Sequence, residues 1–410
     1  MPGMPRSRGS RLTRKRVAAA LALLLVAGLA VGAALSWHFS SQVIVPDHSP
    51  WTTGVEIVGV DARSVELERG DATEQPGVYG LTWEGGHAIL GPIVATSEET
   101  VTRRISAVRG YLTTDTDAGM DGRVYVGDPG QSLGLPYRDV AIEGELGSLP
   151  AWRVPGRGRT WAIVVHGHNG DRQDALELVP ALRRAGLTAL LVSYRNDPGV
   201  TPSPDGHHHL GLTEWRDVDA AAAYALSHGA RRLVLVGISM GGAVVGRFMA
   251  DSPRAAEVAA LVLDAPVLDW RETLEFNATL MGLPALAALP LRWAIEARID
   301  VDWEALDYES HLEDFELPIL LFHGAEDELV PKEPSEELAE ALPGNVTYFE
   351  VPEADHVQAW NVDPALYERR LSRFLRAALG PAAQSTRGST TASGTQASGT
   401  KKGRPEGRPR

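Results

Sequence analysis

One serine stands between two glycines at the end of a short apolar run, in the order Gly237-Ile-Ser239-Met-Gly241. The preceding residues, Leu233–Val236, favour a buried strand, and Gly242–Ala250 favour a helix. At a strand-to-helix turn the serine backbone is strained, and flanking glycines avoid clashes that a β-carbon would cause. The pattern predicts that Ser239 presents its hydroxyl as a nucleophile. An ordinary serine in a βα turn is the alternative.

A serine hydroxyl attacks effectively only when a base removes its proton and a carboxylate orients that base. Asp327 follows the apolar run Ile319–Phe322, and His356 follows the run Val346–Val351. We therefore predict Asp327 as the orienting acid and His356 as the base, in the chain order serine, acid, histidine. Three other carboxylates remain alternatives for the acid: Asp264, Glu326 and Glu328.

Acyl transfer also requires hydrogen-bond donors for the oxygen that becomes negative. The backbone N–H of Met240 stands where the following helix begins, and there the helix dipole favours negative charge. We expect the second donor in the loop His166–Gly170, most simply the backbone N–H of His168. The side chain of Asn169 is an alternative donor, but a structural hydrogen bond within the loop is the expected role.

Histidines in two places raise the alternative of a metal site: His166 and His168 in that loop, and the triplet His207–His209. Three adjacent histidines cannot all face one ion from a regular element, and no carboxylate stands at a ligand spacing beside them. We therefore expect no metal and no cofactor. The triplet is interpreted as a solvated loop or a rim beside the substrate.

Composition narrows the classes of function. The chain has 410 residues, of which 44% are hydrophobic and 22% charged, as in an ordinary globular protein. It has no cysteine, which excludes thiol catalysis, disulfides and thiolate metal sites. The net charge is −14 although both ends of the chain are basic, so the body is strongly acidic. Such a body argues against nucleic acid as a partner.

The segment Val17–Trp37 carries no charged residue, and as a helix it would cover roughly the 30 Å of a bilayer core. Basic residues stand directly before it, at Arg14, Lys15 and Arg16. We expect a single-pass membrane anchor with its N-terminus in the cytoplasm and the catalytic domain on the other side of the cell membrane. A signal peptide cleaved near Val31–Ala33, giving a secreted protein, is the alternative.

Four regions are expected along the chain. Residues 1–37 form a basic stub and the anchor, 38–136 a small β-rich domain, 137–381 a catalytic domain with a helical cap at 267–314, and 382–410 a disordered basic tail. The β character of the second region is concentrated in three stretches: Val55–Val60, Val78–Trp83 and Arg123–Val126.

The third region alternates strands with helices, which is typical of a mostly parallel sheet with helices on both faces. The expected strands are Trp161–Val165, Ala189–Ser193, Leu233–Val236, Ala260–Leu263, Ile319–Phe322 and Val346–Val351. The expected helices are Ala175–Arg184, Glu214–Ser227 with Thr213 as N-cap, Gly242–Ala250 and Pro364–Ala378. The cap region is rich in Leu and Ala, and its prolines should divide it into short helices above the ends of the strands.

These motifs together resemble the α/β-hydrolase superfamily, specifically its serine hydrolases with a Ser-Asp-His triad and a helical cap. The resemblance rests on His166–Gly170, Gly237–Gly241, Gly324–Asp327 and the loop of His356, and covers roughly residues 137–381. It implies the α/β-hydrolase fold, and it extends less securely to the prolyl-peptidase-like and acylglycerol-lipase-like branches. Nothing before Tyr137 repeats like the blades of a propeller.

The expected activity is hydrolysis of carboxylic esters through an acyl-enzyme, with small-molecule or lipid-like esters as substrates. A serine peptidase that cleaves amides is one alternative. The other is a non-catalytic envelope protein that uses a hydrolase fold as a binding surface. The apolar residues of the cap either belong to the core or line the substrate pocket, and in the second case they would favour an acyl or aromatic group there.

Overall fold

The computed structural model describes residues 9–49, 53–308 and 316–380. Its centre is an eight-stranded sheet in the order β15-β14-β13-β12-β10-β11-β9-β8. The strands are β8 (Arg138–Glu143), β9 (Ser148–Val154), β10 (Thr160–Val165), β11 (Thr188–Val192), β12 (Arg232–Ile238), β13 (Val258–Asp264), β14 (Ile319–Gly324) and β15 (Val346–Val351). Strands β10 to β15 pair in parallel, whereas β9 pairs antiparallel with both β11 and β8.

Each strand expected in this region is present, because buried parallel strands are apolar on both faces and stand out in the sequence. The sequence analysis did not identify β8 and β9. β8 lies at the edge of the sheet and is largely exposed, so polar residues interrupt its apolar pattern.

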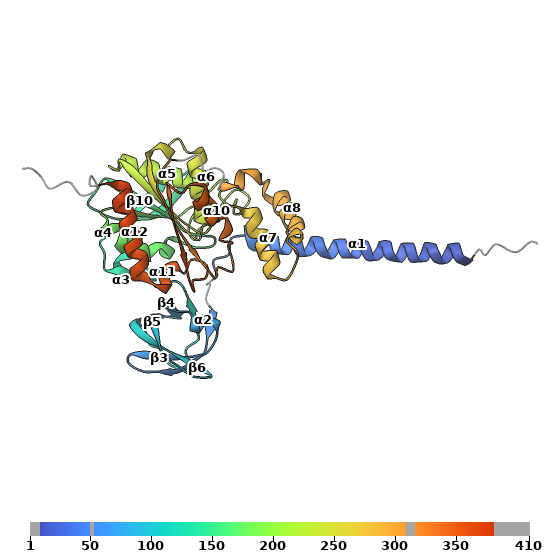
Figure 1. The fold of residues 1–410 in the computed structure, drawn as a ribbon, viewed down its shortest axis with the longest axis horizontal. Coiled ribbons are helices and arrows are strands. Elements are labelled where there is room, and N and C mark those ends of the chain that lie inside the picture. The colour runs from blue at the N-terminus through green and yellow to red at the C-terminus, as the bar shows by residue number, and fades with distance from the viewer. Residues whose placement is uncertain (1–8, 50–52, 309–315, 381–410) are drawn as a thin grey trace, which may run out of the picture.

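Helices cover both faces of this sheet (Figure 1). One face packs against α5 (Trp215–Ser227) and α6 (Met240–Asp251), and the other against α4 (Val179–Arg184) and α12 (Pro364–Leu379). Alternate residues of β10 enter the two cores: Ile163 faces α5 and α6, while Val164 faces α4 and α12. The parallel sheet with helices on both faces agrees with the predicted fold class.

Two helical details differ from expectation. Residues Arg172–Leu178 form a 3-10 helix, η1, so the α-helical part begins only at Val179. The hydroxyl of Thr213 has no hydrogen-bond partner within the described residues and does not cap α5. Instead the buried carboxylate of Glu214 accepts hydrogen bonds from the backbone of the preceding turn, which fixes the entry to α5.

The β-rich domain is a seven-stranded antiparallel sheet in the order β1-β7-β4-β5-β6-β3-β2. Its strands are β1 (Thr53–Val55), β2 (Ile57–Val60), β3 (Ser64–Glu68), β4 (Tyr79–Trp83), β5 (Gly86–Thr96), β6 (Thr100–Arg109) and β7 (Ala118–Asp121). Only Glu56 separates β1 from β2, and these strands lie at opposite edges. This bent segment therefore curls the sheet around its own small core. The stretch Arg123–Val126, expected as a strand, is irregular.

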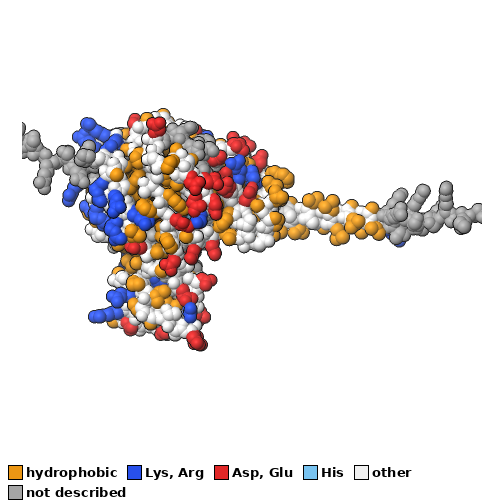
Figure 2. Space-filling view, in the orientation of Figure 1, with side chains coloured by type: hydrophobic (Ala, Val, Ile, Leu, Met, Phe, Trp, Pro, Cys, Tyr) orange, Lys and Arg blue, Asp and Glu red, His pale blue; other side chains and the backbone are white. Residues whose placement is uncertain are grey.

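The N-terminal helix α1 (Gly9–Ile44) extends away from the body, and Figure 2 shows apolar side chains along its described length. Its segment Arg16–Ile44 is long and apolar enough to cross a membrane. The helix does not end at Trp37 but continues to Ile44, whose side chain is fully buried in the core on the α5 and α6 side. The end of α1 is thus part of the domain that contains the eight-stranded sheet.

The described part of the cap contains α7 (Trp270–Leu280), η3 (Ala285–Ala287), α8 (Ala288–Ile299) and η4 (Glu304–Leu306). Pro284 precedes η3 and separates it from α7, as expected. Pro290 lies in the first turn of α8, where proline is tolerated, and does not end a helix. The remaining expected cap residues, 309–314, and the expected tail, 382–410, lie outside the described residues.

Candidate active site

Ser239 lies at the sharp turn between β12 and α6, with φ 53° and ψ −121°. This is a strained conformation for a residue with a β-carbon. The following helix approaches the sheet so closely that a β-carbon added at Gly241 would lie 2.2 Å from the carbonyl oxygen of Val165. Glycine at 241 is therefore required for the turn, which places Ser239 at the carboxyl end of the parallel strands.

The hydroxyl of Ser239 lies 2.8 Å from Nε2 of His356, and Nδ1 of the same ring lies 2.8 Å from Oδ2 of Asp327. These residues come from the loops after β12, β15 and β14. Because Nδ1 faces a carboxylate, it carries the proton, and Nε2 is free to accept one from the serine. The structure thus brings the three predicted side chains into one hydrogen-bonded chain.

Asp327 is held in its charged form. Burial by itself disfavours that charge, but hydrogen bonds from His323 and His356 hold the pKa of the carboxyl group well below its usual value. The other oxygen, Oδ1, accepts from the backbone N–H groups of Leu329 and Val330 at 2.9 and 2.8 Å. Because these donors bind the second oxygen, Oδ2 stays aimed at the imidazole.

His323 is a supporting residue that the sequence analysis did not single out. Its ring is fully buried at the end of β14, with Nε2 3.3 Å from Oδ2 of Asp327 and Nδ1 2.9 Å from the hydroxyl of Ser335. A histidine four residues before the predicted acid was the available signal. Its contact with the acid depends on the turn after β14, which the spacing alone does not fix.

The alternative acids occupy other positions. Asp264 is buried and accepts a hydrogen bond from the hydroxyl of Tyr367 at 2.7 Å, rather than contacting the imidazole of His356. Burial raises the pKa of Asp264 to about 6, so this group is a poor permanent anion. Glu326 and Glu328 line the neighbouring cleft. The geometry therefore favours Asp327 among the candidate acids.

Both predicted oxyanion donors lie beside the serine. The loop carrying His168 passes so close that a β-carbon on Gly167 would lie 3.0 Å from Cβ of Ser239. The backbone N–H groups of His168 and Met240 donate to no acceptor within the described chain. They are therefore available to bind a ligand oxygen.

Asn169 has a structural role, but its contacts reach beyond its own loop. Its Oδ1 accepts from the backbone N–H of Asp47 at 3.0 Å and lies 3.0 Å from Nε2 of His208. The triplet that contains His208 is not a solvated loop, since His208 is only 1% exposed. Its burial follows from the end of α1, whose Ile44 carbonyl accepts the His208 backbone N–H.

His166 forms a buried ion pair with Asp197, with Nε2 2.8 Å from Oδ2, and its ring stacks on Tyr194. Burial alone would lower the pKa of His166, but the charge and hydrogen bond of Asp197 raise it to about 9. This pair anchors the start of the oxyanion loop. Among the described residues, no group of three or more His, Asp or Glu side chains is arranged to hold a metal ion.

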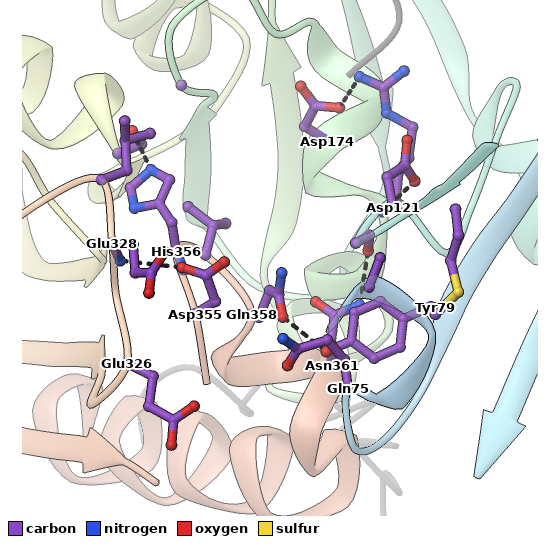
Figure 3. Close-up of a pocket in the computed structure, with 18 of the residues that line it drawn as sticks. Gln75, Tyr79, Asp121, Asp174, Glu326, Glu328, Asp355, His356, Gln358 and Asn361 are labelled. Atoms are coloured by element: carbon purple, nitrogen blue, oxygen red, sulfur yellow. Dashed lines mark hydrogen bonds and ion pairs between the residues drawn. The ribbon is translucent and has the colours of Figure 1, made fainter. Parts of the chain in front are cut away.

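Ser239 and His356 open into a cleft of about 1040 Å³. Figure 3 shows its wall, where Gln75, Tyr79 and Asp121 face Gln358 and Asn361. The first three belong to the β-rich domain, which therefore forms one side of the cleft. No described cap residue lines it. The expectation that apolar cap residues line the pocket is wrong for the described part of the cap, in which α8 packs against α1 instead.

Hydrogen bonds join the β-rich domain to the segment that follows His356. The hydroxyl of Tyr79 donates to Oε1 of Gln358 at 2.8 Å, and the amide of Asn361 donates to the carbonyls of Val78 and Gly122 at 2.8 and 2.7 Å. Contacts of this kind depend on tertiary packing. The sequence of residues 38–136 gave no sign of them.

The cleft is acidic. Arg123 is the one Lys or Arg side chain among its described lining residues, and it pairs with Asp174 at 2.5 Å. The acidic side chains that line the cleft are Asp71, Glu74, Asp121, Asp174, Glu177, Glu326, Glu328, Glu353 and Asp355. Burial raises the pKa of Glu177 to about 8, so this group is mostly neutral at pH 7, and the other carboxyl groups supply the negative charge. The local charge therefore opposes anionic groups.

Comparisons with known proteins agree with this geometry. Residues 178–381 match the model of the prolyl oligopeptidase family. The chain is 30% identical over 264 residues to the uncharacterized protein Rv2307c of Mycobacterium tuberculosis, covering 60% of this chain and 82% of the relative. This chain belongs to the prolyl oligopeptidase family of α/β-hydrolases.

A solved structure shares the fold of this catalytic domain. A solved esterase of Pyrococcus furiosus, Pf2001, superposes with a TM-score of 0.51 at 22% identity, covering 62% of this chain and 96% of that chain. The uncharacterized protein YfhR of Salmonella typhimurium is 24% identical over 276 residues, covering 63% of this chain and 86% of the relative. Residues 56–121 match a domain of unknown function, DUF8805. The family match, together with the geometry of Ser239, His356 and Asp327, shows that the chain is a serine hydrolase.

Proposed function

We propose that this serine hydrolase cleaves carboxylic esters through an acyl-enzyme, with Ser239 as nucleophile, His356 as base and Asp327 as the orienting acid. The observation that carries the proposal is the hydrogen-bonded chain from Ser239 through His356 to Asp327, with 2.8 Å at each step. A buried, charged acid beside the imidazole stabilises the positive ring that forms when the serine loses its proton.

In the proposed reaction Oγ of Ser239 bonds to the carbonyl carbon of the ester, and its proton passes to Nε2 of His356. The backbone N–H groups of His168 and Met240 bind the oxyanion. His356 then returns the proton to the leaving alkoxide as the ester bond breaks. Water, deprotonated by the same imidazole, hydrolyses the acyl-serine and restores the enzyme.

The preferred substrates are small-molecule or lipid-like esters without a negative group near the scissile bond. The solved Pyrococcus relative is named an esterase, which supports ester substrates. The acidic wall of the cleft supports the restriction on charge. Peptides are a second candidate, which the match to the prolyl oligopeptidase family favours.

We propose that α1 anchors the enzyme in the cell membrane, with the N-terminus in the cytoplasm and the catalytic domain outside. The support is the apolar length of Arg16–Ile44 and the basic residues before it. The end of α1 contributes Ile44 to the core. Cleavage near Ala33 would leave that end in place, so secretion after processing is the competing outcome. The mass of the mature chain in a membrane fraction decides between them.

The test of catalysis uses the full chain with p-nitrophenyl esters and aminoacyl p-nitroanilides. Ser239→Ala should lower ester turnover by about 10⁴-fold or more and abolish labelling by a fluorophosphonate probe. Ser252→Ala, a buried serine at the end of α6, is the matched control and should keep both properties. Undiminished ester turnover in Ser239→Ala would refute the assignment. Faster release of nitroaniline than nitrophenol would favour the peptidase.

A further inference from the structure

The segment from the end of α7 to the first half of α8 exposes large apolar side chains to solvent. We call this surface the cap tip; it consists of Leu280, Met281, Leu283, Leu286 and Trp293. Leu286 is 73% exposed and Trp293 66% exposed, and no charged residue occurs from Phe276 through Leu291. An exposed apolar surface of this kind on a globular protein indicates a site of contact with a membrane or with another protein.

Helix α8 of the cap packs against α1. The guanidinium of Arg298 donates to the hydroxyls of Ser40 and Ser41 at 2.8 Å each, and it lies 4.7 Å from the ring centre of Trp37. These contacts hold the cap beside the last turns of α1. They also define its position along the helix, because Trp37 ends the apolar run from Val17, and the polar residues His38, Ser40 and Ser41 follow it.

The cap tip lies on the membrane side of these contacts. Figure 1 shows α7 and α8 outside the main body, on the side from which α1 leaves it. Trp37 is 56% exposed, and tryptophan at the end of an apolar helix is typical of the boundary between lipid and water. A surface that continues from this boundary along α1 would meet the hydrocarbon of the adjacent leaflet.

Resting on the proposed anchoring by α1, we propose that the cap tip inserts into the bilayer leaflet next to α1. The catalytic domain then has two membrane contacts, which restrict its rotation about the helix. The end of α1 also contacts the oxyanion loop, where the carbonyl of Val43 lies 2.9 Å from Nε2 of His168. The loop beside Ser239 is therefore held next to the helix that enters the bilayer, where lipid-like esters are found.

The absence of cysteine allows a direct test in the full chain. A single cysteine at Leu286, labelled with the fluorophore NBD, reports on the cap tip in vesicles of phosphatidylcholine and phosphatidylglycerol. Leu24→Cys in α1 is the control for lipid, and Tyr111→Cys in the β-rich domain, at a residue 94% exposed, is the control for water. Turnover of p-nitrophenyl acetate checks that each labelled chain is folded.

We expect doxyl-labelled lipid to quench the probes at 286 and 24 several-fold more than the probe at 111, and iodide to quench mainly the probe at 111. An aqueous response at 286 with a lipid response at 24 would overturn the cap-tip proposal and leave the anchor intact. A water-like response at 24 would refute the anchor instead. Protection from both quenchers at 286 would show a protein partner, such as a second copy of this chain, and would also overturn the proposal.

Ester turnover provides a second test of whether the cap tip inserts into the bilayer. Leu283→Ser combined with Leu286→Ser should lower the turnover of an ester embedded in vesicles several-fold, with turnover of soluble p-nitrophenyl acetate unchanged. The matched control is Val108→Ser, at an exposed apolar residue of the β-rich domain. Equal loss on both substrates would indicate misfolding, and the quenching result with folded Leu286→Cys would then decide the proposal.

Discussion

The imidazole of His168 lies 2.9 Å, at Nε2, from the carbonyl oxygen of Val43, so a loop beside the nucleophile is tied to the last residues of the N-terminal helix. A second hydrogen bond joins the same segments, donated by the backbone N–H of Asp47 to Oδ1 of Asn169. Burial lowers the pKa of His168 to about 4, so the ring is neutral at physiological pH and acts as a hydrogen-bond donor to the carbonyl. The helix end therefore helps to position the proposed oxyanion amide.

His168→Ala should lower kcat on the order of tenfold while KM changes little, because the backbone N–H remains but its loop loses a fixed contact. Steady-state kinetics with a p-nitrophenyl ester measure both constants. His228→Ala, at an exposed histidine after α5, is the control and should be neutral. An unchanged kcat in His168→Ala would contradict a positioning role for the ring.

Asp327→Asn should lower kcat by about 10⁴-fold, since an amide no longer enforces the tautomer that leaves Nε2 free to accept the serine proton. Asp264→Asn should lower it by less than about tenfold, because that side chain contacts Tyr367 rather than His356. The two substitutions are equal in size and both sites are buried, so each controls for the other. A larger loss from Asp264→Asn would mean that the acid is misassigned.

Stability should fall as the pH rises through the range in which His166 loses its proton. Its pKa is raised from 6.5 to about 9 by Asp197, so the folded chain binds more protons than the unfolded chain between these values. The stabilisation is complete below about pH 6.5 and is lost toward pH 9 and above. The melting temperature in detergent, measured across this range, should decrease, and His166→Gln should flatten the decrease. The same slope in both proteins would exclude this pair as its cause.

Much of the catalytic domain could be predicted because its strands are short apolar runs and its reactive residues directly follow them. Ser239, Asp327 and His356 are recognisable from such local positions. The features that the sequence analysis missed arise from packing between distant segments. Tyr79 is separated in sequence from its partner Gln358, and Ile44 from the core that buries it, so no local pattern reveals either contact.

The charge of the cleft should make the enzyme prefer cationic over anionic esters. The two carboxylates nearest to the predicted acid in the chain, Glu326 and Glu328, both line the cleft. An aminoacyl p-nitrophenyl ester with a lysine side chain should have a kcat/KM about tenfold above that of the glutamate analogue, and added salt should shrink the ratio. Glu326→Gln combined with Glu328→Gln should also reduce the ratio of the two kcat/KM values. Glu99→Gln, in the β-rich domain and outside the cleft lining, should not. If neither salt nor the double substitution at Glu326 and Glu328 changes the ratio of the two kcat/KM values, the wall of the cleft does not select substrates by charge.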